Sequence, residues 1–169
     1  MAREEFLVFG APLISEDEIM EVVATLRSGW IGTGPRAREF EKRFAAYVGA
    51  RHAVALNSCT AGLHLSLIVL NIGPGDEVIT SPLTWCATAN AIVHTGARPV
   101  FADVDRRTGN VDPNEIESAL TDRTRAIIPV HFAGRACDMD AIGDVAEQYK
   151  LRVVEDAAHA NPQATRAGR

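Results

Sequence analysis

Three polar segments of this sequence each follow an apolar, strand-like run, and each contains groups that could bind a cofactor. The first is Asn57–Gly62, which follows the run ending at Leu56 and opens a helix-like segment. The first turn of a helix carries unpaired N–H groups and the positive end of the helix dipole, so a phosphate could bind there. Taken alone, this segment is better explained by an ordinary helix cap at Ser58 or Thr60.

The second segment contains Trp85, which follows Ser81–Thr84 at the entrance of a helix-like segment. An indole at the carboxyl end of a strand can lay its face on a planar heteroaromatic ring. Filling of the apolar core is an equally good explanation for a single tryptophan, so this residue alone decides nothing.

The third segment begins where the apolar residues Val153 and Val154 run into Glu155 and Asp156. A carboxylate at this strand end can pair with a protonated pyridine nitrogen, and that pairing keeps the ring of pyridoxal 5'-phosphate (PLP) a strong electron sink. His159 would share a helical face with Asp156 and could donate to a ring substituent. Helix capping and a structural histidine are the alternatives. Together, the three segments indicate a site for PLP.

Strand-like runs alternate with helix-like segments along most of the chain, and this alternation positions the three segments. The strand-like runs are Ala53–Leu56, Val78–Thr80, Pro99–Phe101, Ala126–Val130 and Arg152–Val154. The pattern predicts a three-layer α/β/α fold with a mostly parallel sheet. Ligands in such folds bind at the carboxyl ends of the strands, which is where the three segments lie.

Two helical patterns precede the first strand-like run. A capping box at Ser15 and Glu18 starts the first pattern, and Gly49 ends the second. Between them, Gly32–Ala37 matches the dinucleotide fingerprint G-x-G-x-x-A. That fingerprint requires a preceding strand and an acidic residue about twenty positions later, and the sequence has neither. We therefore interpret Gly32–Ala37 as a turn between helices.

The composition excludes several other classes of protein. The 169 residues carry a net charge of −5 without any Lys/Arg block, so we expect neither a nucleic acid nor a membrane as a partner. Cys59, Cys86 and Cys137 lack metal-ligand spacing and fit free thiols in a reducing cytosol. The sequence has neither signal-peptide features nor a membrane-spanning apolar stretch. We expect a cytoplasmic protein.

Over nearly its whole length, the sequence resembles the nucleotide-sugar aminotransferases of the DegT/StrS type, which are fold-type I PLP enzymes. The resemblance is closest to aminotransferases that convert a 4-keto nucleotide sugar to its 4-amino form. The matching stretches are SGWIGTGPRAREFE, NSCTAGLHLSLIVLNIGPGDEVITSPLTW, GARPVFADVD, RAIIPVHFAG and VVEDAAHA.

The resemblance implies a role for each candidate residue. Thr60 and Ala61 would bind the cofactor phosphate through the backbone, and Trp85 would stack on the pyridine ring. Asp156 would pair with the ring nitrogen, and His159 would lie beside the phenolic oxygen. Trp30 and Thr33 would lie near the sugar substrate, whereas His131 fits a buried structural histidine better than a site residue.

The resemblance also implies an organisation and partners. Residues 1–35 would form an amino-terminal helix and a substrate-side turn, and residues 36–169 part of the PLP-binding large domain. A carboxyl-terminal small domain is expected in the family and is absent from the sequence. The expected partners are a nucleotide-sugar substrate, an amino donor such as glutamate, and a second copy of the chain in a homodimer.

The Schiff-base lysine of the family follows the EDAAH motif, and no lysine follows Asp156 in this sequence. Its lysines are Lys42 and Lys150. We therefore expect a chain truncated before that lysine, inactive by itself, with weak non-covalent affinity for PLP. The alternatives are a non-catalytic PLP-binding or interaction module, or a relative of the sugar dehydratases, which have histidine in place of the lysine.

Overall fold

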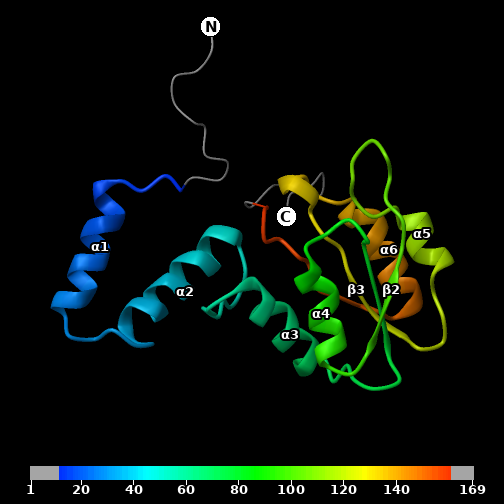
Figure 1. The fold of residues 1–169 in the computed structure, drawn as a ribbon, viewed down its shortest axis with the longest axis horizontal. Coiled ribbons are helices and arrows are strands. Elements are labelled where there is room, and N and C mark those ends of the chain that lie inside the picture. The colour runs from blue at the N-terminus through cyan, green and yellow to red at the C-terminus, as the bar shows by residue number, and fades with distance from the viewer. Residues whose placement is uncertain (1–11, 161–169) are drawn as a thin grey trace, which may run out of the picture. The chain divides into compact units, whose positions relative to one another are not determined.

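The computed structural model describes residues 12–160 of the chain (Figure 1). The chain divides into two compact units, Met1–Ala55 and Leu56–Arg169. The described part of the first unit contains two helices, and the described part of the second contains a four-stranded sheet with helices packed against it.

The two helices of the first unit begin at the sequence signals that predict them. Helix α1 spans Glu16–Arg27, and the Glu18 carboxylate accepts the Ser15 backbone N–H at 2.6 Å in the predicted capping box. Helix α2 spans Pro35–Val48 and has a proline in its first turn, where the missing N–H would have no partner within the helix. Both predicted helices are confirmed.

The turn between α1 and α2 brings Trp30 and Thr33 together. The indole Nε1 of Trp30 donates to the Thr33 carbonyl oxygen at 3.1 Å. The ring lies so close to Gly34 that a Cβ at that position would be 2.1 Å from Nε1. Glycine is therefore needed for this packing, and the Gly32–Ala37 segment forms a turn into α2, as predicted.

The predicted strand at residues 53–56 is wrong. These residues pair with no strand in the described part of the chain. The backbone N–H of Ala55 donates instead to the Glu41 carboxylate of α2 at 2.9 Å. An apolar run becomes a strand only when a neighbouring strand provides hydrogen-bond partners, and its sequence pattern does not show whether one is present.

A parallel sheet with the strand order β2-β1-β3-β4 forms the centre of the second unit. Its strands are β1 (Glu77–Thr80), β2 (Arg98–Phe101), β3 (Thr124–Ile128) and β4 (Arg152–Val153). Every residue of β1 is buried, as expected for an inner strand of a parallel sheet that is covered on both faces.

Helices cover both faces of the sheet (Figure 1). On one face lie α3 (Cys59–Val69) and α4 (Cys86–His94), and on the other lie α5 (Pro113–Ser118) and α6 (Met139–Tyr149). Successive strand residues point to opposite faces, so Val78 packs in the core with α3 and α4, and Ile79 in the core with α5 and α6. The predicted three-layer α/β/α fold is confirmed.

Candidate cofactor-binding site

Three segments leave the carboxyl ends of the strands and line one cavity of about 300 Å³. They lie within Ser81–Trp85, Val130–Ala133 and Asp156–His159, and they follow β1, β3 and β4 respectively. The pairing of strands continues past β4, because Asp156 forms a parallel bridge with Val130. The fold thus brings Trp85, Asp156 and His159 to the same cavity.

Asp156 is a buried carboxylate in the wall of this cavity. The residue is only 6% exposed, and its Oδ2 accepts the hydroxyl of Thr88 at 2.7 Å. Its Oδ1 accepts the backbone N–H of Ala158 at 3.3 Å and lies 3.7 Å from the thiol sulfur of Cys59. These contacts come from α4, from α3 and from the loop after β4, so the start of α3 lies beside the Asp156 carboxylate.

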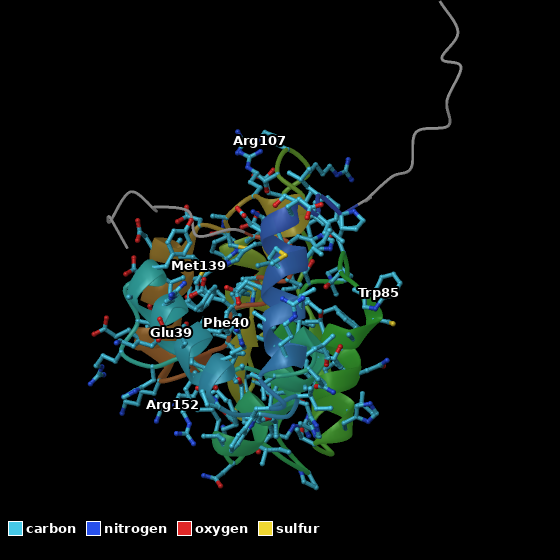
Figure 2. All side chains as sticks on the ribbon, turned by 90° about the vertical axis from the view of Figure 1, so that its left-hand side faces the viewer. Glu39, Phe40, Trp85, Arg107, Met139 and Arg152 are labelled. Atoms are coloured by element: carbon cyan, nitrogen blue, oxygen red, sulfur yellow. The ribbon has the colours of Figure 1, made fainter. Side chains whose placement is uncertain are left out.

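Trp85 and His159 are exposed parts of the cavity wall. Trp85 precedes α4 and is 79% exposed, and Figure 2 shows its side chain standing out from the ribbon. His159 is also exposed and lines the same cavity. Because the Trp85 ring is not packed in the core, core filling does not explain this residue.

The first turn of α3 contains Thr60 and Ala61. Ser58 caps this helix by accepting the backbone N–H of Ala61 at 3.2 Å, so the ordinary helix cap considered from the sequence is present. Thr60 is exposed and Ala61 is half-buried. A phosphate bound here would meet the Ser58 hydroxyl together with the backbone amides of the turn.

His131 lines the cavity, but both of its ring nitrogens are engaged. Nδ1 accepts the backbone N–H of Cys137 at 3.1 Å, and Nε2 lies 2.9 Å from Oε2 of Glu155. An amide nitrogen can only donate, so the ring proton resides on Nε2 and is donated to Glu155. This hydrogen bond lowers the pKa of the Glu155 carboxyl below its usual range. The arrangement is that of a structural histidine.

Asn110 holds one wall of the cavity and was missed by the sequence reasoning. Its Nδ2 donates to the carbonyl oxygens of Arg135 and Ala136 at 3.1 and 2.9 Å, and its Oδ1 accepts the Phe132 N–H at 2.9 Å. Asn110 is only 4% exposed, so this amide organises the loop after β3 from within. Its position next to Gly109 is typical of a turn and gave no signal of this contact.

The loop held by Asn110 also approaches the backbone at His159. Gly134 has φ +84, and a Cβ at that position would lie 2.9 Å from the carbonyl oxygen of His159. Both the left-handed backbone and the short distance favour glycine here. The segments after β3 and β4 are therefore packed tightly where they form the cavity.

The cavity and the first turn of α3, which adjoins it at Asp156, fit the chemical groups of PLP. A buried carboxylate held by three donors suits a protonated ring nitrogen, the exposed Trp85 face suits a planar ring, and the first turn of α3 suits a phosphate. Among residues 12–160, no group of three His, Cys, Asp or Glu side chains could hold a metal ion, and no helix is long and apolar enough to cross a membrane.

The parallel sheet between two helical layers, with this cavity at its carboxyl edge, is the architecture of the fold-type I PLP-dependent aminotransferases. Comparison with known proteins supports this class and identifies one family within it. The chain belongs to the DegT/DnrJ/EryC1/StrS aminotransferase family, whose sequence profile matches residues 12–169.

Two curated relatives illustrate the family. The spore coat polysaccharide biosynthesis protein SpsC of Bacillus subtilis is 61% identical over 158 residues, which are 94% of this chain and 41% of the relative. The UDP-4-amino-4-deoxy-L-arabinose–oxoglutarate aminotransferase of Shewanella sediminis is 54% identical, over 92% of this chain and 40% of the relative. The chain thus spans less than half the length of the curated relatives it matches.

Two solved structures that resemble this chain contain forms of one cofactor. The PLP form of Spr1654 from Streptococcus pneumoniae superimposes with a TM-score of 0.87 at 43% identity, over 91% of this chain and 43% of that one. The form with PMP, the amine form of the cofactor, superimposes with a TM-score of 0.88 at 42% identity, over 92% and 43% of the two chains. These two neighbours thus hold pyridoxal 5'-phosphate and its amine form.

Proposed function

We propose that this chain carries the cofactor-binding part of a PLP-dependent aminotransferase that acts on a keto group of a nucleotide-linked sugar. The observation that carries the proposal is the buried Asp156 carboxylate, held beside the first turn of α3 in a cavity that Trp85 also lines. The printed names of the relatives, which refer to polysaccharide biosynthesis and to an amino sugar linked to UDP, support the substrate class. The word oxoglutarate in one of these names supports glutamate as the amino donor.

Each candidate residue then has a defined task. PLP, when bound, supplies an electron sink that stabilises negative charge on the substrate carbon. Asp156 holds the proton on the ring nitrogen, and the amides of Thr60 and Ala61 bind the phosphate, which replaces the Ser58 hydroxyl as the acceptor of the Ala61 N–H. Trp85 covers one face of the ring and excludes water from it. His159 donates a hydrogen bond to the phenolic oxygen.

Trp30 and Thr33 belong to the first unit, and we propose them as residues on the substrate side. Their contact with each other, from the Trp30 indole to the Thr33 carbonyl, holds the turn in one shape. A turn of defined shape can present its exposed groups to a sugar. Trp30 is 58% exposed and therefore has a free face for such a contact.

The covalent lysine must come from outside this sequence in our proposal. Lys42 lies within α2, and Lys150 precedes β4, whereas Asp156 follows it. Lys150 and Asp156 are therefore at opposite ends of the same strand. Without a lysine to move the proton between substrate and cofactor carbons, we expect this chain by itself to bind PLP weakly and to catalyse no transamination.

Reduction with borohydride tests this expectation. The purified chain is incubated with PLP, treated with borohydride and digested. The masses of the lysine-containing peptides are then measured by mass spectrometry. We expect no stoichiometric adduct on Lys42 or Lys150 and no turnover with glutamate. A specific adduct on either lysine accompanied by turnover would contradict the proposal. If the chain binds PLP but shows no activity even when a second chain supplies the lysine, the alternative of a non-catalytic PLP-binding module is favoured.

We also propose that the complete enzyme works in the cytoplasm as a homodimer. Large apolar side chains are exposed on α1 and α3, among them Leu26 at 62% and Val69 at 78%. Exposed apolar surface of this kind marks sites of protein interaction. Light scattering on the complete enzyme should give twice the mass of one chain, and a monomer at working concentration would contradict the proposal.

A further inference from the structure

We infer that Thr88 is a positioning residue of the cofactor site, whose hydroxyl orients the Asp156 carboxylate toward the ring nitrogen of the cofactor. The inference rests on the proposed function of Asp156 and goes one step beyond it. Thr88 is fully buried on α4, and its Oγ1 lies 2.7 Å from Oδ2 of Asp156. A hydroxyl that donates to a carboxylate forms a short, charge-assisted hydrogen bond, which fixes the direction of both groups.

The Thr88 hydroxyl also contacts the hydroxyl of a second threonine, and its bond to Asp156 decides which of the two donates. Thr84 and Thr88 have their hydroxyl oxygens 2.8 Å apart. Thr88 has a single hydroxyl proton, which it gives to the carboxylate, so the Thr84 hydroxyl must donate to Thr88. The two hydroxyls therefore form a directed chain that ends on Asp156, and each bond of such a chain polarises the next.

The contacts of Asp156 also indicate which oxygen faces the cofactor. Oδ1 lies beside two donors, the Ala158 N–H and the Cys59 thiol. Burial and the nearby Asp156 charge raise the pKa of Cys59, so the thiol keeps its proton and can donate it. Oδ2 accepts only the Thr88 hydroxyl among these contacts, so it has a lone pair left. The ring N–H is expected to meet Oδ2, the oxygen that Thr88 orients.

The position of Thr88 in the chain links two parts of the site. Trp85 immediately precedes α4, and Thr88 follows it by three residues, within the first turn of that helix. The same helical turn thus positions the ring of Trp85 and, through Thr88, orients the carboxylate of Asp156. Through its hydrogen bond to Asp156, the buried Thr88 anchors this turn to the segment that follows β4.

The test compares Thr88→Val, which keeps the shape but removes the hydroxyl, with Thr88→Ser, which keeps the hydroxyl. The dissociation constants of PLP and of its 1-deaza analogue, which has C–H in place of the ring nitrogen, are measured by fluorescence titration of the purified chain. Thr88→Val should weaken PLP binding about tenfold, and Thr88→Ser by less than about twofold. Neither should alter binding of the deaza analogue, because that ligand makes no bond to Asp156.

The outcomes separate this inference from the proposed function. Unchanged PLP binding in Thr88→Val, or equal weakening of both ligands, would overturn the positioning role of Thr88. If Asp156→Asn in the same assay leaves PLP binding unchanged, the proposed function itself fails and the inference falls with it. Thermal unfolding verifies that each variant is folded. If Thr88→Val does not fold, Thr88→Ala tests the same loss of the hydroxyl with the same expected results.

Discussion

Replacing Asp156 with asparagine should weaken binding of PLP to this chain by about tenfold to a hundredfold. The change removes the negative charge that pairs with the ring nitrogen, and a charge-assisted hydrogen bond of this kind accounts for a loss of that size. Asparagine has nearly the same shape, and its amide can still interact with Thr88 and Cys59, which contact the carboxylate in the wild-type chain. The measurement is a fluorescence titration with PLP at neutral pH.

A matched control is available on the surface of the same unit. Asp144 is exposed on α6, so Asp144→Asn makes the same chemical change away from the cavity. This variant should bind PLP as the wild type does. The 1-deaza analogue should bind the wild type and Asp156→Asn with similar affinity. Equal PLP affinity of the wild type and Asp156→Asn would show that Asp156 does not hold the ring nitrogen.

Replacing Glu77 with glutamine should lower the melting temperature of the chain by about 5 °C. Glu77 begins β1 and is only 1% exposed. Its Oε1 accepts from Arg98 at 2.7 Å and from Arg123 at 2.6 Å, and its Oε2 accepts the Thr121 hydroxyl at 2.6 Å. Glutamine leaves two guanidinium groups without their counter-charge, although solvent reaches both of them and moderates the loss.

The pH dependence of the Glu77 effect has a definite sign. The Thr121 hydroxyl and the Arg98 and Arg123 guanidinium groups lower the pKa of Glu77 to about 2 in the folded chain, from an ordinary value of 4.5. A lowered folded pKa means that the stabilisation is fully present above pH 4.5 and is lost as the pH falls toward 2. The difference in melting temperature between wild type and Glu77→Gln should therefore shrink over that range.

Two controls accompany the Glu77 variant: a matched substitution on the surface, and the PLP affinity of Glu77→Gln itself. Glu147 is exposed on α6, so Glu147→Gln should leave the melting temperature unchanged within about one degree. Glu77 starts its strand, whereas the cavity follows the strand ends, so Glu77→Gln should bind PLP with wild-type affinity. A melting temperature of Glu77→Gln equal to that of the wild type at neutral pH would contradict this account of the ion-pair network.

Local sequence signals predicted those parts of the fold in which neighbouring residues decide the structure. The capping box at Ser15 and the glycine at Gly49 marked helix ends that the structure contains. The apolar runs that became β1 and β3 are buried by α4 and α6, the helices that follow them, so the strand and helix patterns predicted the same layers there. The run that became β4 is followed by no described helix and pairs with β3. The polar residues at the ends of those runs could be placed at one edge because parallel strands share a direction.

Contacts between distant segments could not be predicted in this way. Thr88 and Cys59 contact Asp156 across 68 and 97 positions of sequence, and nothing in their immediate surroundings indicates the partner. Glu77 sits at the start of an apolar strand, where an acidic residue usually indicates exposure, but distant arginines make its burial possible. The extended run at residues 53–56 failed as a predicted strand for the same reason, because strand pairing is decided by a neighbour elsewhere in the chain.

A crystal structure of this chain with PLP tests the central claim most directly. We predict that the pyridine nitrogen lies about 3 Å from Oδ2 of Asp156 and that the phosphate contacts the first turn of α3. The Trp85 ring should cover one face of the pyridine. Binding of PLP at another place, or a ring nitrogen directed away from Asp156, would contradict the account.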